Sequence, residues 1–146
     1  MCKEKPDIVT IQETKKETID RKMVGSIWSF RFREWAFLPS EGRSGGILVM
    51  WDSRTVRGVE VLLGAYSVSV KLSAVSGGNE WWFSGIYGPC RSRERKEFWE
   101  ELAGLYGLCA ECWCVGGDFN VDRFPSEKLN GGRITWSMRN FDTFIT

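Results

Sequence analysis

Four polar side chains that end apolar runs could together cleave a phosphodiester bond. Glu13 follows IVTIQ, Tyr87 ends FSGIY, and Asp118 and Asn120 follow CWCVGG. In an extended segment, residues two apart point to the same face, so the last two can address one ligand. Phosphodiester cleavage needs a carboxylate for a hard divalent cation, a base for the attacking water and neutral donors beside the phosphate. We therefore expect Glu13 to bind the metal, Asp118 to act as the base, and the other two side chains, an amide and a phenol, to contact the phosphate.

Taken singly, each of these residues has a plainer interpretation. An acid after a strand is usually a solvated loop residue or a helix cap, and a tyrosine is more often part of a core or an interface. Asp52, which follows ILVMW, is placed like Glu13, but the sequence DS is typical of a turn. We interpret Asp52 as a turn residue.

The composition excludes several other kinds of site. The 146-residue chain has 20 Lys+Arg and 19 Asp+Glu, so nucleic-acid binding has to come from a local patch. It contains no histidine, which excludes serine-type triads, Cys-His nucleophiles and histidine-ligated metals. Carboxylates with a hard metal ion, Mg²⁺ or Mn²⁺, remain the route to hydrolysis.

The cysteines and the apolar runs indicate where the protein resides. Three of five cysteines crowd into CAECWC at 109–114 without the second ligand pair of a zinc site. We expect reduced core thiols, with a disulfide framework or a structural zinc as alternatives. The N-terminus is charged, and the run ILVMW is far too short to cross a bilayer. These features predict a soluble, intracellular protein that does not enter a membrane.

The pattern of apolar runs predicts many strands and few helices. Strands are expected over 8–12, 35–39, 46–51, 55–63, 66–75, 81–88 and 112–118. The alternation within 66–75 predicts a half-exposed strand. The best helix is 92–107, with Ser92 as N-cap and Gly107 after its C-cap, and another begins near Met138. These elements favour a single α/β or α+β domain with antiparallel strand pairs.

Three motifs, taken together and in order, resemble a known superfamily. PDIVTIQETK at 6–15, SGIYGP at 84–89 and GGDFN at 116–120 resemble the endonuclease/exonuclease/phosphatase superfamily. The flanking stretches SGGILVMWD, RKEFWEEL and GDFNVDRFPSEKLNGGR are more narrowly similar to the endonuclease domain of plant LINE-type, non-LTR retroelements. The resemblance covers nearly the whole chain.

The resemblance implies both a fold and a site. The fold is a two-sheet β-sandwich flanked by helices, a four-layer, DNase I-like arrangement, with a Mg²⁺-dependent site at one edge of the two sheets. It implies a metal-ligand role for Glu13, a phosphate-side role for Tyr87 and a catalytic role for the pair Asp118 and Asn120. The implied activity is hydrolysis of phosphodiester bonds in DNA, and the implied location is the nucleus.

The family pattern also has parts that this sequence lacks. Family members begin with a strand whose asparagine helps to hold the metal, and they end with strands that bear an aspartate and then an Asp-His pair. We therefore interpret 1–146 as a partial domain, incomplete at both ends, that lacks the first strand and the Asp-His region. Because the groups of such a site act together, we expect weak or absent endonuclease activity from this chain.

Two other functions stay open. The chain could be a non-catalytic remnant or a nucleic-acid-binding module, or it could belong to another phosphatase or exonuclease branch, which the flanking stretches disfavour. Arg133, Trp136 and Arg139 have near-helical spacing and residue types that suit phosphate contact and base stacking. Arg31 and Arg33 form a second candidate surface. An ordinary mixed surface is the alternative for both.

Overall fold

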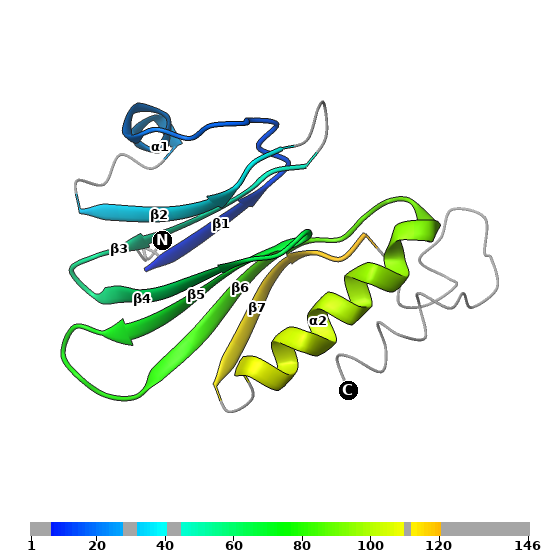
Figure 1. Cartoon of the computed structure of the whole chain (residues 1–146). Coiled ribbons are helices and arrows are strands. Elements are labelled where there is room, and N and C mark those ends of the chain that lie inside the picture. The colour runs from blue at the N-terminus through cyan, green and yellow to red at the C-terminus, as the bar shows by residue number, and fades with distance from the viewer. Residues whose placement is uncertain (1–6, 28–31, 41–44, 110–111, 121–146) are drawn as a thin grey trace, which may run out of the picture.

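The structure is a computed structural model that describes residues 7–27, 32–40, 45–109 and 112–120. Two β-sheets pack face to face, with one helix on the outer face of each (Figure 1). In chain order the elements are β1 (Ile8–Gln12), α1 (Arg21–Ile27), β2 (Arg33–Leu38), β3 (Ile47–Asp52), β4 (Val56–Leu63), β5 (Ser67–Ala74), β6 (Glu80–Tyr87), the 3-10 turn η1 (Ser92–Glu94), α2 (Arg95–Cys109) and β7 (Trp113–Asp118). The expected four-layer, DNase I-like sandwich is confirmed.

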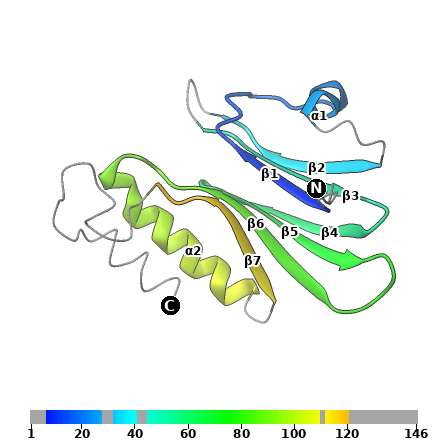
Figure 2. The same cartoon turned by 180° about the vertical axis from the view of Figure 1, so that it is seen from behind.

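The topology places the carboxyl ends of β1, β6 and β7 at one end of the sandwich. The first sheet has the order β1-β3-β2 and is antiparallel, and the second has the order β4-β5-β6-β7. β7 runs parallel to β6 because α2 carries the chain back along the sheet between them. β1 packs across the core against β6 and β7, so these three strands lie on the same side of the sandwich in both views (Figure 1 and Figure 2).

Strand β5 is buried on both faces. Val68, Val70 and Leu72 point into the core between the sheets. On the opposite face, Ser69 is fully buried, and its hydroxyl lies 2.6 Å from that of Ser84 on β6. The prediction of a half-exposed strand is wrong, because the outer face of β5 is occupied by the contact between Ser69 and Ser84 and by the hydrogen bond from Ser67 to Glu101 of α2 at 2.9 Å.

Helix α2 presents the apolar face that its sequence predicts, but its ends differ from the prediction. The buried side chains of the helix are Phe98, Trp99, Leu102, Leu105 and Cys109. Arg91, not Ser92, is the N-cap residue of the η1 turn before the helix, and it makes no side-chain cap hydrogen bond. The helix also continues through Gly107, since Cys109 still packs on its buried side. Within the described residues, no helix is long and apolar enough to cross a membrane. The helix expected near Met138 lies outside these residues.

The cysteines are mostly at the surface. Cys109 is buried, and burial raises the pKa of its thiol. Cys90, Cys112 and Cys114 are exposed. The prediction of core thiols is therefore correct for Cys109 and wrong for these three.

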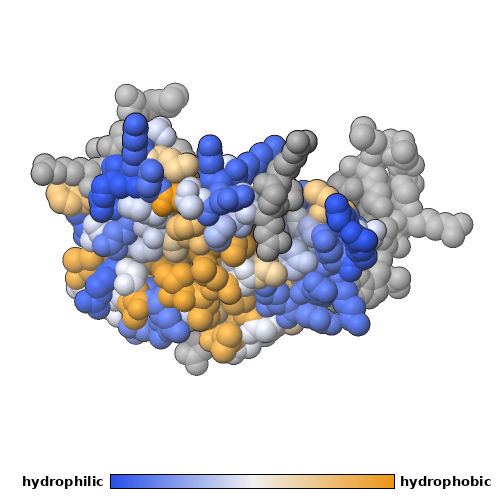
Figure 3. All heavy atoms as spheres, turned by 45° about the horizontal axis from the view of Figure 1, so that its top comes forward, coloured by the Kyte–Doolittle hydropathy of each residue, from blue (hydrophilic) through white to orange (hydrophobic). Residues whose placement is uncertain are grey.

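Strand β4 forms one edge of the second sheet. Its register against β5 shifts between Gly58 and Glu60, which is a β-bulge. Gly58 has no room for a side chain, because a Cβ there would lie 2.7 Å from the ring of Trp51. Beyond the bulge, Val61 and Leu63 are 45% and 57% exposed. The face shown in Figure 3 is largely hydrophilic and carries a hydrophobic area near its centre.

Candidate active site at one end of the sandwich

The sandwich brings the ends of β1, β6 and β7 together. Tyr87 is the last residue of β6 and lies opposite Asp118, the last residue of β7, in the parallel register. Glu13 follows β1 directly in the other sheet. The two sheets approach closely behind these residues, because Gly85 of β6 has no side chain and Thr10 of β1 packs against it. A Cβ at position 85 would lie only 2.7 Å from Oγ1 of Thr10. The fold thus brings together residues that are far apart in sequence.

The Tyr87 phenol links the two sheets. Its ring packs against the core between them, and its hydroxyl is hydrogen-bonded to the side chains of Glu13 and Asn120. Burial raises the pKa of Tyr87 to about 12, with help from the hydrogen bond and negative charge of Glu13, whereas the hydrogen bond with Asn120 lowers it. The phenol is protonated at neutral pH, as an ordinary tyrosine is, and the raised pKa extends this protonated state to higher pH.

Alkaline titration should show the contact between Glu13 and Tyr87. We expect Tyr87 to ionise near pH 12 in the folded protein, against a usual pKa of 10.0. Because the folded pKa is the higher one, the stability that this group contributes is complete below pH 10.0 and is lost as the pH rises through about 12. In Glu13→Gln the pKa of Tyr87 should fall, yet stay above 10.0, since burial is its largest cause.

The measurement is the ultraviolet absorbance of tyrosinate, with Tyr87→Phe identifying the signal of this residue. An identical titration in the wild type and in Glu13→Gln would contradict the contact.

Asn120 fastens the end of β7 to the loop after β6. Its backbone N–H donates to Oδ1 of Asp118 at 2.8 Å, and its Nδ2 donates to the carbonyl of Gly88 at 2.6 Å. The N–H of Gly88 donates in turn to the carbonyl of Asp118 at 2.7 Å. Asn120 has a left-handed backbone with φ 53°, a conformation that asparagine tolerates better than most residues. These bonds fix Asp118 and Asn120 relative to Tyr87.

Removing the Asn120 side chain should destabilise this end of the fold. We expect Asn120→Ala to lower the free energy of unfolding by about 2 kcal/mol, because it loses the hydrogen bonds to the Gly88 carbonyl and the Tyr87 hydroxyl, together worth about 1 kcal/mol, and suffers left-handed strain of about 1 kcal/mol. Asn120→Gly removes the amide without the strain, so it should cost about half as much. Urea denaturation followed by circular dichroism measures both losses, and equal losses would contradict the strain argument.

Left-handed residues mark this end of the molecule. Among the described residues, the non-glycine residues with positive φ are Glu13, Lys15 and Asn120. Two backbone hydrogen bonds hold the segment that contains Glu13 and Lys15. The N–H of Thr14 donates to the carbonyl of Gly46 at 3.3 Å, and the N–H of Lys15 donates to the carbonyl of Gly45 at 3.1 Å. Such conformations persist only where the surroundings impose them, and they are frequent at functional sites.

The donor set suits a hard cation held by few protein ligands. No group of three or more His, Cys, Asp or Glu that could hold a metal occurs among the described residues. Mg²⁺ is commonly bound through one or two carboxylates, with waters and substrate phosphates as the other ligands. Glu13, an exposed carboxylate at the end of β1, fits that requirement.

The other residues singled out in the sequence lie away from this site or outside the residues that the structure describes. Asp52 ends β3, and its Oδ1 accepts the N–H of Arg54 at 2.9 Å, which confirms the turn. Arg33 donates from Nη2 to the carbonyl of Arg21 at 3.3 Å, so it contacts α1. Residues Arg31, Arg133, Trp136 and Arg139 lie outside the described residues.

One functional group escaped the sequence reasoning. The carbonyl of Gly88 accepts the Asn120 amide, and a backbone acceptor leaves no mark in the sequence. The sequence does indicate this close contact through the glycine, because a side chain at Gly88 would collide with the backbone of Phe119. The glycine of IYGP thus permits the close approach of the two segments.

Comparison with solved structures supports the fold. No protein-family model and no curated protein matches the sequence. An endonuclease/exonuclease/phosphatase family protein from Bacteroides thetaiotaomicron is 12% identical with a TM-score of 0.65, over 94% of this chain and 54% of that one. The mannosyl-6-phosphatase of the same species is 12% identical with a TM-score of 0.61, over 94% and 56%. D. rerio TDP2 complexed with a single-strand DNA product is 13% identical with a TM-score of 0.54, over 80% and 49%. The chain thus spans about half the length of these proteins and shares their fold.

Proposed function

We propose that this chain is part of a divalent-metal-dependent phosphodiesterase of the endonuclease/exonuclease/phosphatase superfamily that acts on DNA. The observation that carries the proposal is the contact of Tyr87 with both Glu13 and Asn120, beside Asp118, at one end of the sandwich. The shared fold of solved nucleases and phosphatases supports it, as does the DNA product bound to D. rerio TDP2.

Each side chain has a distinct task in this proposal. Glu13 would hold Mg²⁺ or Mn²⁺, which when bound neutralises charge on the phosphate. Asp118 takes the proton of the attacking water, because its carboxylate is exposed at the end of β7. In the structure Asn120 donates one amide hydrogen to the carbonyl of Gly88 and is also hydrogen-bonded to the Tyr87 hydroxyl, and with substrate bound its second amide hydrogen would turn from that hydroxyl to the phosphate.

Tyr87 supplies the remaining donor. Its hydroxyl is hydrogen-bonded to the Glu13 carboxylate in the structure, and at neutral pH it carries the proton that a donor needs. With the Glu13 carboxylate holding the cation, the Tyr87 hydroxyl would be free to donate to a phosphate oxygen, where a neutral donor would stabilise the developing charge.

We propose further that the chain derives from a plant LINE-type retroelement endonuclease and comprises part of its domain. The motifs and their flanking stretches support this origin, and a retroelement nuclease would act in the nucleus. The family pattern includes an Asp-His pair, and the sequence contains no histidine. We therefore expect slow cleavage by this chain.

A small phosphomonoester is the second candidate substrate. The mannosyl-6-phosphatase shares the fold at a TM-score of 0.61 and favours this possibility. A metal ion beside a base and neutral donors could hydrolyse either a phosphodiester or a phosphomonoester. The choice between these substrates therefore depends on which of them the residues around the site bind.

Incubation with two substrates separates the candidates. Folded protein is given supercoiled plasmid or a sugar phosphate, with Mg²⁺ or with a chelator, and nicked DNA and released phosphate are measured. Mg²⁺-dependent nicking supports the endonuclease, and phosphate release without nicking supports the phosphatase. If folded protein does neither, both catalytic functions are rejected and the chain is a non-catalytic module.

A further inference from the structure

Two pairs of basic residues flank the candidate site. Lys15 and Lys16 come shortly after Glu13, and Arg91 and Arg93 come shortly after Tyr87. All four basic side chains are exposed. They lie on segments that leave different sheets at the same end of the sandwich, as the paths after β1 and β6 show (Figure 1). We refer to these four residues as the basic rim.

The lysine side of the basic rim has a fixed backbone. Lys15 N–H donates to the carbonyl of Gly45 at 3.1 Å, and the carbonyl of Lys16 accepts the N–H of Ser40 at 2.9 Å. The two lysines therefore project from a segment that is bonded to the neighbouring loops.

The arginine side is fixed as well. The carbonyl of Arg91 accepts the N–H of Glu94 at 3.1 Å, which closes the turn before α2. Arg95 donates from Nη2 to the carbonyl of Cys90 at 3.3 Å and so holds the loop that follows Tyr87. Arg91 and Arg93 thus extend from an ordered backbone.

The side chains of the basic rim have no ion-pair partners among the described residues. Within the described part of the chain, none of its four residues forms an ion pair, whereas Lys71 pairs with Glu80 at 3.1 Å and Lys96 approaches Glu100 at 4.0 Å. The whole chain has a net charge of only +1, so positive charge concentrated here is a local property. Exposed Lys and Arg side chains with no acidic partner are the usual contacts to nucleic-acid phosphates.

We propose that the basic rim binds the phosphates on either side of the scissile bond and so selects a polynucleotide over a small phosphate ester. This inference rests on the proposed function and deepens it. The two pairs stand on segments that leave different sheets beside the site, one after β1 and one after β6. A ligand must carry several phosphates along a chain to engage both pairs, and a phosphomonoester has only one.

Binding measurements without metal test this inference. The probe is a fluorescent single-stranded oligonucleotide, its affinity is followed by anisotropy over a series of salt concentrations, and a chelator prevents cleavage. The double variant R91A/R93A should weaken binding about tenfold and reduce the slope of log K against log salt by about 1 to 2, because two phosphate contacts are lost. Lys15→Ala with Lys16→Ala should behave alike.

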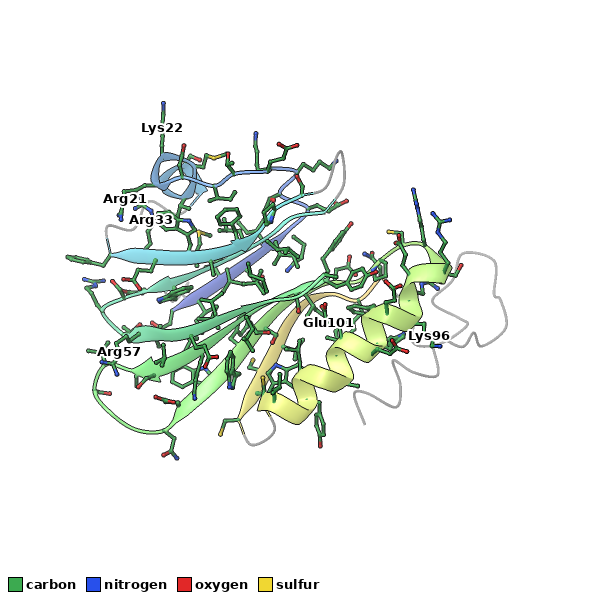
Figure 4. The ribbon with its side chains drawn as sticks, viewed as in Figure 1. Arg21, Lys22, Arg33, Arg57, Lys96 and Glu101 are labelled. Atoms are coloured by element: carbon green, nitrogen blue, oxygen red, sulfur yellow. The ribbon has the colours of Figure 1, made fainter. Side chains whose placement is uncertain are left out.

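A charge-matched control makes the result specific. The double variant K22A/R57A removes the same charge from two exposed cations, one on α1 and one on β4, which lie away from the loop between β6 and α2 (Figure 4). It should leave the salt slope unchanged. The inference would be overturned if R91A/R93A and K22A/R57A lost equal affinity for the oligonucleotide, or if R91A/R93A lost none. Polyglutamate is a second probe, because it carries negative charge but no phosphate. If R91A/R93A weakened binding to polyglutamate as much as binding to the oligonucleotide, the inference would also be overturned.

The binding result and the cleavage result are separable. A specific effect of R91A/R93A together with no nicking by the wild type leaves the basic rim as a polynucleotide-binding surface and rejects the catalytic proposal. Nicking of plasmid with no specific effect of R91A/R93A rejects the basic rim alone.

Discussion

Asp118→Asn is expected to lower the rate of Mg²⁺-dependent nicking by about two to four orders of magnitude, the usual contribution of a general base. The amide cannot take a proton from water. It can still offer its Oδ1 to the N–H of Asn120, which the aspartate accepts at 2.8 Å, so the turn after β7 should survive. The measurement is the initial rate of plasmid nicking, with circular dichroism to show that the variant is folded.

The matched control is Asp52→Asn. Asp52 is also an acid at the end of an apolar strand, β3. It lies opposite Arg33, the first residue of β2, and next to the start of β1. Glu13 follows the other end of β1, so the two acids lie at opposite ends of the sandwich. Oδ1 of Asp52 accepts a hydrogen bond from the backbone N–H of Arg54 at 2.9 Å, just as Oδ1 of Asp118 accepts one from the N–H of Asn120. The control should keep the wild-type rate. Equal rates for the wild type and Asp118→Asn would contradict the proposed base.

Gly117→Ala is expected to destabilise the protein by about 2 to 4 kcal/mol, a large fraction of the roughly 5–15 kcal/mol typical of a domain. Gly117 has a φ of 140°, where a side chain is strained, and a Cβ there would collide with the backbone carbonyl of Ile86 in β6. A carbonyl within a sheet cannot turn aside as a side chain can. The substitution should therefore loosen β7 from β6 and move Asp118 away from Tyr87.

Gly116→Ala provides the comparison one residue earlier. A Cβ at Gly116 would lie 3.3 Å from the ring of Phe83 and 3.6 Å from Thr10, and small shifts of these side chains relieve such contacts. We expect a loss below about 1 kcal/mol there. Urea denaturation measures both variants, and equal losses would show that the backbone of Gly117 is not the cause.

The strands were largely predictable because apolar runs bounded by turn residues define them. The run 8–12 matches β1, and the run 55–63 differs from β4 by a single residue. Helices were harder to place. The helix α1, Arg21–Ile27, was not among the helices expected from the sequence. Thr14 and Lys15 donate their N–H groups to the loop at 45–46, a tertiary bond that local sequence does not contain.

The candidate site was predictable as residue types but not as an arrangement. Glu13, Tyr87 and Asp118 each end an apolar run, and this position made them candidates. Their proximity depends on α2 returning the chain so that β7 runs parallel to β6, and on β1 crossing the same end of the other sheet. The raised pKa of Tyr87 is likewise a property of the assembled fold, since its causes are burial and the Glu13 carboxylate.

The β-bulge of β4 bears on how the protein behaves at high concentration. A regular outer strand with apolar side chains can template addition of a strand from another molecule, which is a common first step of aggregation. In β4 the register breaks between Gly58 and Glu60, just before exposed Val61 and Leu63. The bulge makes this edge irregular, and Glu60 places a charge beside the apolar stretch. Trp51 occupies the space that a side chain at Gly58 would need, so the irregular edge and the core between the sheets meet at this glycine.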